Sequence, residues 1–270
     1  MRDVKTINER LREYQTEWFN RIVCPWVKKG GAVPDKMKKW VKKNLHKDEY
    51  SFSQPFFTGV YNYLDNKPLI MFVGQETNGW GNWEDFDGES DISLSQSYVM
   101  AFAENNTITK DPKKEFIYKD KEYMLYDSSP FWNFVRDICN QDIQVVWNEL
   151  DKIHYRTPEK KCIKLYPEDE SFLNKPIQDE KSLLRLEIET IKPKMVIFLT
   201  GPSYVNSMQS ALNNKALQKP CKDQPIISFG LGPIHCRWTY HPRYLNWEKN
   251  LELKTNVENG LKKDINLYCK

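Results

Sequence analysis

Residues 69–73, the apolar run Leu-Ile-Met-Phe-Val, constrain the fold more than any other part of this chain of 270 residues. An unbroken apolar run that ends at a glycine, here Gly74, is typical of a strand buried on both faces of a sheet. The residues that follow, 74–83, are polar, aromatic and rich in glycine. Open α/β sheets bind their ligands where such strands end. We therefore expect residues 74–83 to border a functional site.

The rest of the chain alternates between helical and strand patterns. Periodic apolar residues predict helices at residues 4–26, 93–103, 130–138, 179–191, from 202 or 203 to 212, and 246–263, the last capped by Asn246. Short apolar runs predict strands at residues 69–73, 143–147, 195–199, 226–229 and 236–240, and a hairpin within residues 107–126. Strands that alternate with helices favour an α/β fold, here a three-layer α/β/α sandwich with a mainly parallel central sheet.

A second polar loop follows the expected strand at residues 236–240. His241 stands before Pro242, and a residue before proline is disfavoured in the helical region, so a turn is expected there. Taken alone, this segment is an ordinary strand and turn. The two loops taken together are more informative.

The pair resembles the two signature loops of the uracil-DNA glycosylase superfamily. In that family a first strand ends in Gly-Gln-Asp-Pro-Tyr-His or a variant, and a late strand ends in His-Pro-Ser-Pro-Leu. Here residues 74–78 read Gly-Gln-Glu-Thr-Asn and residues 241–245 read His-Pro-Arg-Tyr-Leu. The order, the separation and the strand-end setting all fit, over a stretch from about residue 55 to the C-terminus. The resemblance implies the fold of that family and a monofunctional, metal-free base-excision enzyme.

Two polar residues of these loops match catalytic positions of the family. Cleavage of a base–sugar bond passes through an oxocarbenium-like state, while negative charge moves onto the departing base. The resemblance implies that Glu76 orients the attacking water and that His241, as a neutral imidazole, donates to the base oxygen. The alternative for Glu76 is a surface carboxylate in a loop, and its strand-end position slightly favours the catalytic role.

Four further residues are candidates for holding the flipped base. The resemblance implies that the backbone amide of Gln75 binds the base and that Asn148, at the expected end of the second strand, reads the edge of a uracil. An asparagine that caps a turn is the alternative for Asn148. Asn78 stands where the family has a tyrosine that excludes the methyl group of thymine, so specificity for uracil is open. Trp80 is a candidate stacking wall, with Trp83 and Phe86 as alternatives, unless these side chains pack in the core.

Contacts with DNA are implied for two residues of the second loop. Arg243 replaces a small turn residue and is suited to pair with a phosphate. Leu245 matches a leucine that wedges into the duplex, and packing beneath the final helix is the alternative. Six lysines within residues 36–47 form either a solvated face, which we favour, or a phosphate-binding surface. Acidic residues at 84–91 suggest a solvated loop rather than a metal site, and they would repel DNA.

Composition sets the remaining expectations. Hydrophobic residues make up 40% of the chain, which suits one folded domain at residues 51–270 with a lysine-rich helical extension, residues 1–50, packed on its core. A net charge of +3 neither requires nor excludes a nucleic-acid partner. No apolar run is long enough to cross a bilayer and no signal peptide is visible, so we expect a cytoplasmic monomer without a membrane partner. Six scattered cysteines favour reduced thiols and no iron–sulfur cluster, metal or other cofactor.

The leading hypothesis is a DNA glycosylase that hydrolyses the N-glycosidic bond of a deaminated or damaged base such as uracil, with DNA that contains the modified base as its partner. One alternative is a non-catalytic nucleic-acid-binding or nucleotide-binding protein of the same fold. Another is a hydrolase of a small nucleoside-like metabolite, because a fold does not determine a function. The hypothesis predicts that Glu76, Asn148 and His241 line one cleft.

Overall fold

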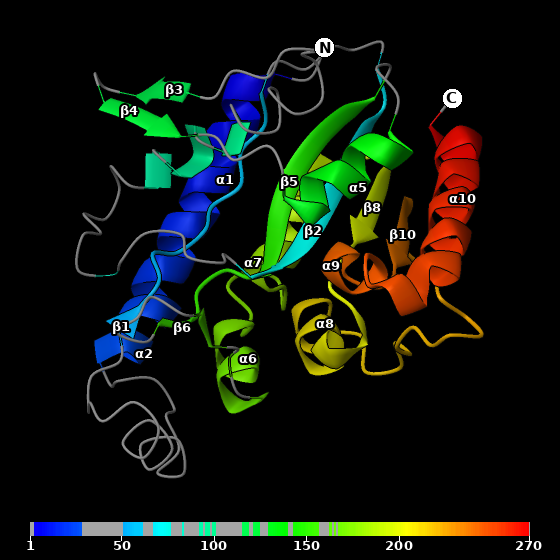
Figure 1. Cartoon of the computed structure of the whole chain (residues 1–270). Helices are drawn as coiled ribbons and strands as arrows, with labels where there is room; N and C mark the ends of the chain where they lie inside the picture. Colours follow the sequence, from blue (N-terminus) through cyan, green and yellow to red (C-terminus); the bar gives the residue numbers. More distant parts are fainter. Residues whose placement is uncertain are drawn as a thin grey trace.

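A five-stranded sheet forms the centre of the computed structural model (Figure 1). The structure describes residues 3–28, 51–61, 67–76, 83, 92–93, 95–97, 99–100, 115–118, 121–124, 129–139, 143–156, 162–163, 165 and 167–269. The strand order is β5-β2-β8-β10-β9. The strands are β2 (Leu69–Glu76), β5 (Gln144–Asp151), β8 (Met195–Phe198), β9 (Ile227–Leu231) and β10 (Ile234–Trp238). β5, β2, β8 and β10 are mutually parallel and β9 is antiparallel to β10, which confirms the expected α/β fold with a mainly parallel sheet.

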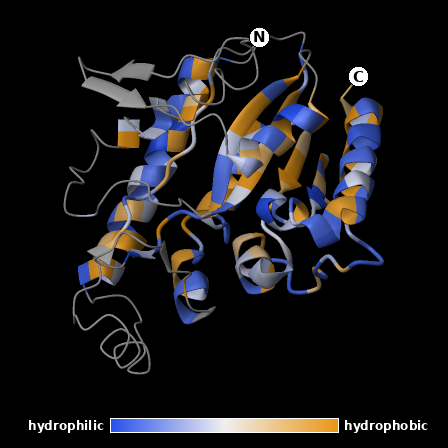
Figure 2. Cartoon of the chain, in the orientation of Figure 1, coloured by the Kyte–Doolittle hydropathy of each residue, from blue (hydrophilic) through white to orange (hydrophobic). Residues whose placement is uncertain are grey.

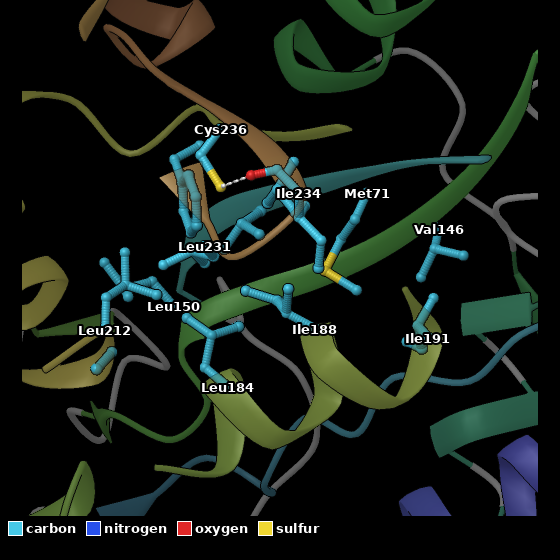
Figure 3. Close-up of a cluster of buried hydrophobic side chains, with 14 of the residues drawn as sticks. Met71, Val146, Leu150, Leu184, Ile188, Ile191, Leu212, Leu231, Ile234 and Cys236 are labelled. Carbon is cyan, nitrogen blue, oxygen red and sulfur yellow. Dashed lines mark hydrogen bonds between the residues drawn. The ribbon is translucent and has the colours of Figure 1, made fainter. Parts of the chain in front are cut away.

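Helices cover both faces of this sheet because its strands are apolar on both sides. One core contains α1 (Val4–Trp18), α7 (Leu183–Ile191) and α8 (Val205–Ala211). The other contains α5 (Pro130–Ile138), α9 (Pro242–Leu245) and α10 (Leu251–Tyr268). Figure 3 shows how the first core forms: Met71, Val146 and Leu150 of the strands meet Leu184 and Ile188 of α7. Figure 2 shows the same division in hydropathy, with largely hydrophobic strands and outer helices of mixed character.

The N-terminal helix belongs to these cores. Ile7 and Leu11 of α1 share the core of α7, and the helix continues through a π-helical segment, η1 (Phe19–Val23), into α2 (Cys24–Lys28). The expected helix at residues 4–26 is therefore confirmed. Trp26 packs against Phe52 at 4.8 Å between ring centroids, next to a small antiparallel sheet. That sheet consists of β1 (Ser51–Phe52), β6 (Tyr155–Arg156) and β7 (Cys162–Ile163). The lysine-rich residues 36–47 lie outside the described part of the chain.

Several smaller elements agree with the sequence. The expected hairpin is formed by β3 (Glu115–Tyr118) and β4 (Lys121–Met124), and the described residues between 92 and 100 are helical. The remaining short helices are α6 (Pro167–Leu173), η3 (Pro202–Tyr204) and η4 (Glu248–Asn250). Within the described residues, no helix is both long and apolar enough to cross a bilayer.

Several expected boundaries are wrong. The first strand, expected at residues 69–73, continues to Glu76, so that Gln75 and Glu76 lie on the strand and not in the loop. The second strand, expected at residues 143–147 and ending at Asn148, continues to Asp151, because Asn148 and the adjoining Lys152 are held by the buried Glu187. The helix expected from residue 179 begins only at Leu183, after the cap Ser182. The final helix begins at Leu251 and is not capped by Asn246: the side chain of Asn250 donates to the carbonyl of Tyr244 at 2.7 Å and closes a turn between α9 and α10.

Candidate functional site

The carboxyl end of β2 and the loops after β8 and β10 are tied to one another by hydrogen bonds. The side-chain amide of Gln75, on β2, donates to the carbonyl oxygen of Thr200, just after β8, at 2.6 Å. The backbone N–H of Gly201 donates to the carbonyl oxygen of Thr239, just after β10, at 2.9 Å. Figure 1 shows α8 and α9 at this edge of the sheet. The strand ends therefore form one connected structure.

Gly201 lies between Gln75 and His241. Its φ of +78° is a backbone conformation that side chains rarely permit. A Cβ atom at this position would lie 3.4 Å from the backbone nitrogen of His241 and 3.9 Å from Nε2 of Gln75. Gln75 and His241, more than 160 residues apart in sequence, therefore both lie next to this one glycine.

At Gln75, β2 is paired with β5 on one side and no longer with β8 on the other. Pairing between β2 and β8 ends at Val73 and Phe198, whereas pairing between β2 and β5 continues to Glu76 and Asp151. Leu199 donates to the carbonyl of Val73, and alternate residues of a strand direct their backbone groups to the same side. The N–H of Gln75 is therefore directed toward the space beyond β8.

His241 is partly buried and accepts a hydrogen bond at the start of α9. Its Nδ1 accepts from the backbone N–H of Arg243 at 3.2 Å. Removal from water, together with the positive charge of Arg243, lowers the pKa of His241 to about 4. The ring is therefore neutral at pH 7, and because Nδ1 is an acceptor, we assign the proton to Nε2. A neutral imidazole of this tautomer can donate from Nε2 to an anion.

Glu149 is a buried carboxylate that the sequence did not single out. A Cβ atom on Gly74 would lie 2.7 Å from its Oε1, so the carboxylate rests on the backbone of β2 one residue before Gln75. Oε1 accepts from the indole N–H of Trp147 at 2.8 Å. In the sequence, the feature related to Glu149 is Gly74, which ends the apolar run of β2. Any side chain at this position would displace the Glu149 carboxylate.

Asn148 is fully buried on β5, where its side chain contacts Glu187 of α7. Its Nδ2 donates to Glu187 at 2.9 Å, and its Oδ1 accepts from the ammonium group of Lys152. Lys152 and Glu187 also form an ion pair at 2.8 Å, with both side chains almost fully buried. This placement differs from the expected one because the strand runs three residues beyond Asn148, so its amide is not among the strand-end loops that hold His241.

Leu245 and Arg243 have opposite environments. Leu245 is fully buried in the core formed with α5 and α10, so the structure shows the packed alternative and not an exposed wedge. Arg243 is exposed.

The backbone of Glu76 ends β2 in register with Asp151. The side chain of Glu76, together with Asn78, Trp80 and the acidic residues at 84–91, lies outside the described residues.

Sequence reasoning also missed the hydroxyl of Thr200. It is fully buried at the end of β8 and has no hydrogen-bond partner among the described residues. In the sequence, the feature related to this hydroxyl is the Thr-Gly-Pro segment that follows an apolar strand. No group of three or more His, Cys, Asp or Glu in the described ranges is placed to hold a metal ion.

A polar groove of about 710 Å³ lies apart from these loops. It runs between the end of α6, the start of α7 and α8, and Asn174, Lys175, Asn206 and Gln209 are among its lining residues. Gln75, Gly201 and His241 do not line it. The strand-end loops are therefore a separate candidate site.

Comparison with known proteins assigns no role to these residues. No protein-family model matches the chain, and a search of curated proteins found no match.

Proposed function

We propose that this chain is a DNA base-excision glycosylase with the fold of the uracil-DNA glycosylase superfamily, acting on a deaminated or damaged base such as uracil. One observation carries the proposal: Gly201 holds the Gln75 loop and the His241 loop against each other. These are the loops whose sequences resemble the two family motifs. A neutral His241 at this place supports the same conclusion.

The proposed reaction breaks the bond between C1′ of the sugar and a ring nitrogen of the base. The electron pair of that bond goes to the base, and Nε2–H of His241 donates a hydrogen bond to the base oxygen that becomes negative. Water oriented by Glu76 attacks C1′, and its proton passes to solvent while the base is protonated on release. The products are the free base and an abasic sugar.

A neutral imidazole suits this role better than an imidazolium ion. With a pKa of about 4, His241 has little tendency to take up a proton at pH 7, so it acts as a fixed donor. Its Nδ1 is held by the N–H of Arg243, which orients the ring before the substrate arrives. The backbone N–H of Gln75, directed beyond the end of β8, is the second donor that the resemblance assigns to the base.

The test is single-turnover release of free base from oligonucleotides that carry uracil, hypoxanthine or xanthine. We expect an abasic site from at least one of them and none from the undamaged sequence. Free deoxyuridine is the matched control, since its cleavage without cleavage of DNA would indicate a hydrolase of nucleoside-like metabolites. A parent protein that binds these oligonucleotides and releases no base would indicate a non-catalytic binding protein.

A further inference from the structure

Three aromatic rings form a ladder beside His241. Tyr240 stacks on Tyr244 with 5.2 Å between ring centroids and 15° between planes, and Tyr244 contacts Trp247 at 5.1 Å. The ladder begins at a buried ring, since Tyr240 is 6% exposed, and ends at Trp247, which is 50% exposed. It therefore leads from the candidate site to the surface.

Trp247 is held firmly for an exposed residue. Its backbone N–H donates to the carbonyl of Tyr244 at 3.3 Å, and its own carbonyl accepts from the N–H of Asn250 at 2.8 Å. The buried side chain of Asn250 donates to the carbonyl of Tyr244 as well. An aromatic ring that is fixed before binding loses little conformational entropy when a flat group stacks on it.

The charges near Trp247 indicate what kind of flat group fits. The ammonium group of Lys249 lies over one face of the Trp247 ring, 5.1 Å from its centre. Lys249 and the exposed Arg243 offer two cations to a phosphate. Glu248 and Glu252 are also exposed here, so stacking must supply more of the affinity than net charge does.

We propose that Tyr244, Trp247 and Lys249 form a platform that binds an unpaired base of single-stranded DNA beside the His241 loop. The base replaces the ammonium group on the Trp247 ring, and Lys249 then turns to the adjoining phosphate. Stacking of this kind is tolerant of sequence because every base has a flat face. The inference rests on the proposed function only in taking DNA as the partner.

The test measures fluorescence anisotropy of two labelled 12-nucleotide probes: oligo-dT and a strand of the same length with abasic sugars throughout. We expect the parent to bind oligo-dT more tightly than the abasic strand. Trp247→Ala should weaken binding of oligo-dT about fivefold or more, as expected for loss of one stacked base, and leave binding of the abasic strand unchanged. Trp247→Phe should retain most of the affinity. Lys249→Gln should weaken binding of both strands.

Leu267→Ala is the matched control, because Leu267 is an exposed apolar residue near the other end of α10 and should have no effect. The proposal is overturned if oligo-dT does not bind, if the abasic strand binds as tightly, or if Trp247→Ala binds oligo-dT like the parent. Base excision is scored separately. Trp247-dependent binding without excision would reject the proposed function alone, and excision that ignores Trp247 in single strands would reject the platform alone.

Discussion

At the scale of single residues, His241 determines whether the strand-end loops are catalytic. Replacement by serine keeps a side-chain oxygen that can accept from the N–H of Arg243, so the start of α9 should persist. The Nε2–H donor is lost, and single-turnover base excision should slow by about a hundredfold or more. Binding of the same oligonucleotide should change much less, because the donor acts mainly in the transition state.

His235→Ser is the control for this prediction. His235 is exposed, lies at the start of β10, the strand that precedes His241, and stacks on Tyr268 at 3.9 Å. The pH profile gives a second measurement: the neutral form of His241 persists down to about pH 4, so excision should show no step from protonation of His241 between pH 7 and pH 5. Equal rates for parent and His241→Ser would contradict the assigned role.

At the scale of secondary-structure elements, the pair formed by Lys152 and Glu187 joins the end of β5 to α7. Lys152→Met leaves the Glu187 carboxylate buried without its cation, and the free energy of unfolding should fall by about 3–5 kcal/mol. A double variant, Lys152→Met with Glu187→Gln, should recover part of this loss because no charge remains buried. Chemical denaturation measures each value.

The surface pair of Lys181 and Glu189 is a matched comparison. Their nitrogen and oxygen lie 2.8 Å apart, the same distance as in the buried pair, but each side chain is about one-third exposed. Solvent screens such a pair, so Lys181→Met should cost no more than about 1 kcal/mol. If Lys152→Met and Lys181→Met lowered the free energy of unfolding by similar amounts, burial would not determine the strength of the pair formed by Lys152 and Glu187.

This pair also explains what the sequence could and could not predict. Apolar runs placed the strands β2 and β8 and the helix α5, because burial of local patterns decides them. The end of β5 was missed because Glu149, Asp151 and Lys152 looked like loop residues. Their burial depends on partners such as Glu187, which lies 35 residues beyond Lys152, and a distant partner is invisible to a local pattern. The same limit hid Thr200, Gly201 and Glu149 from the analysis of the candidate site.

At the scale of the whole molecule, one buried and one partly buried histidine, His154 and His241, should make the fold sensitive to acid. Burial lowers the pKa of His154 to about 3 and that of His241 to about 4, from an ordinary value of 6.5. Between these values the unfolded chain binds protons that the folded chain does not, so stability is complete above about pH 6.5 and falls as the pH decreases. From pH 7 to pH 4.5, His154 alone should account for about 1–3 kcal/mol.

Denaturant midpoints at pH 7 and pH 4.5 measure this effect. His154→Gln should reduce the difference between the two midpoints, because glutamine does not titrate. His235→Gln should leave the difference as it is in the parent, since His235 is exposed. A parent whose stability does not change over this interval would show that neither histidine is held in its neutral form.

The contacts of Gly201 and its neighbour Thr200 couple three strand ends to one another. Its N–H is bound to the loop after β10, its neighbour Thr200 is bound to Gln75 on β2, and its Cα faces the backbone of His241. Two of these contacts are made by the main chain alone, and the third is made by the side-chain amide of Gln75. A molecule that displaces one strand end must therefore strain the other two, so occupancy at one strand end is transmitted to the others through these contacts.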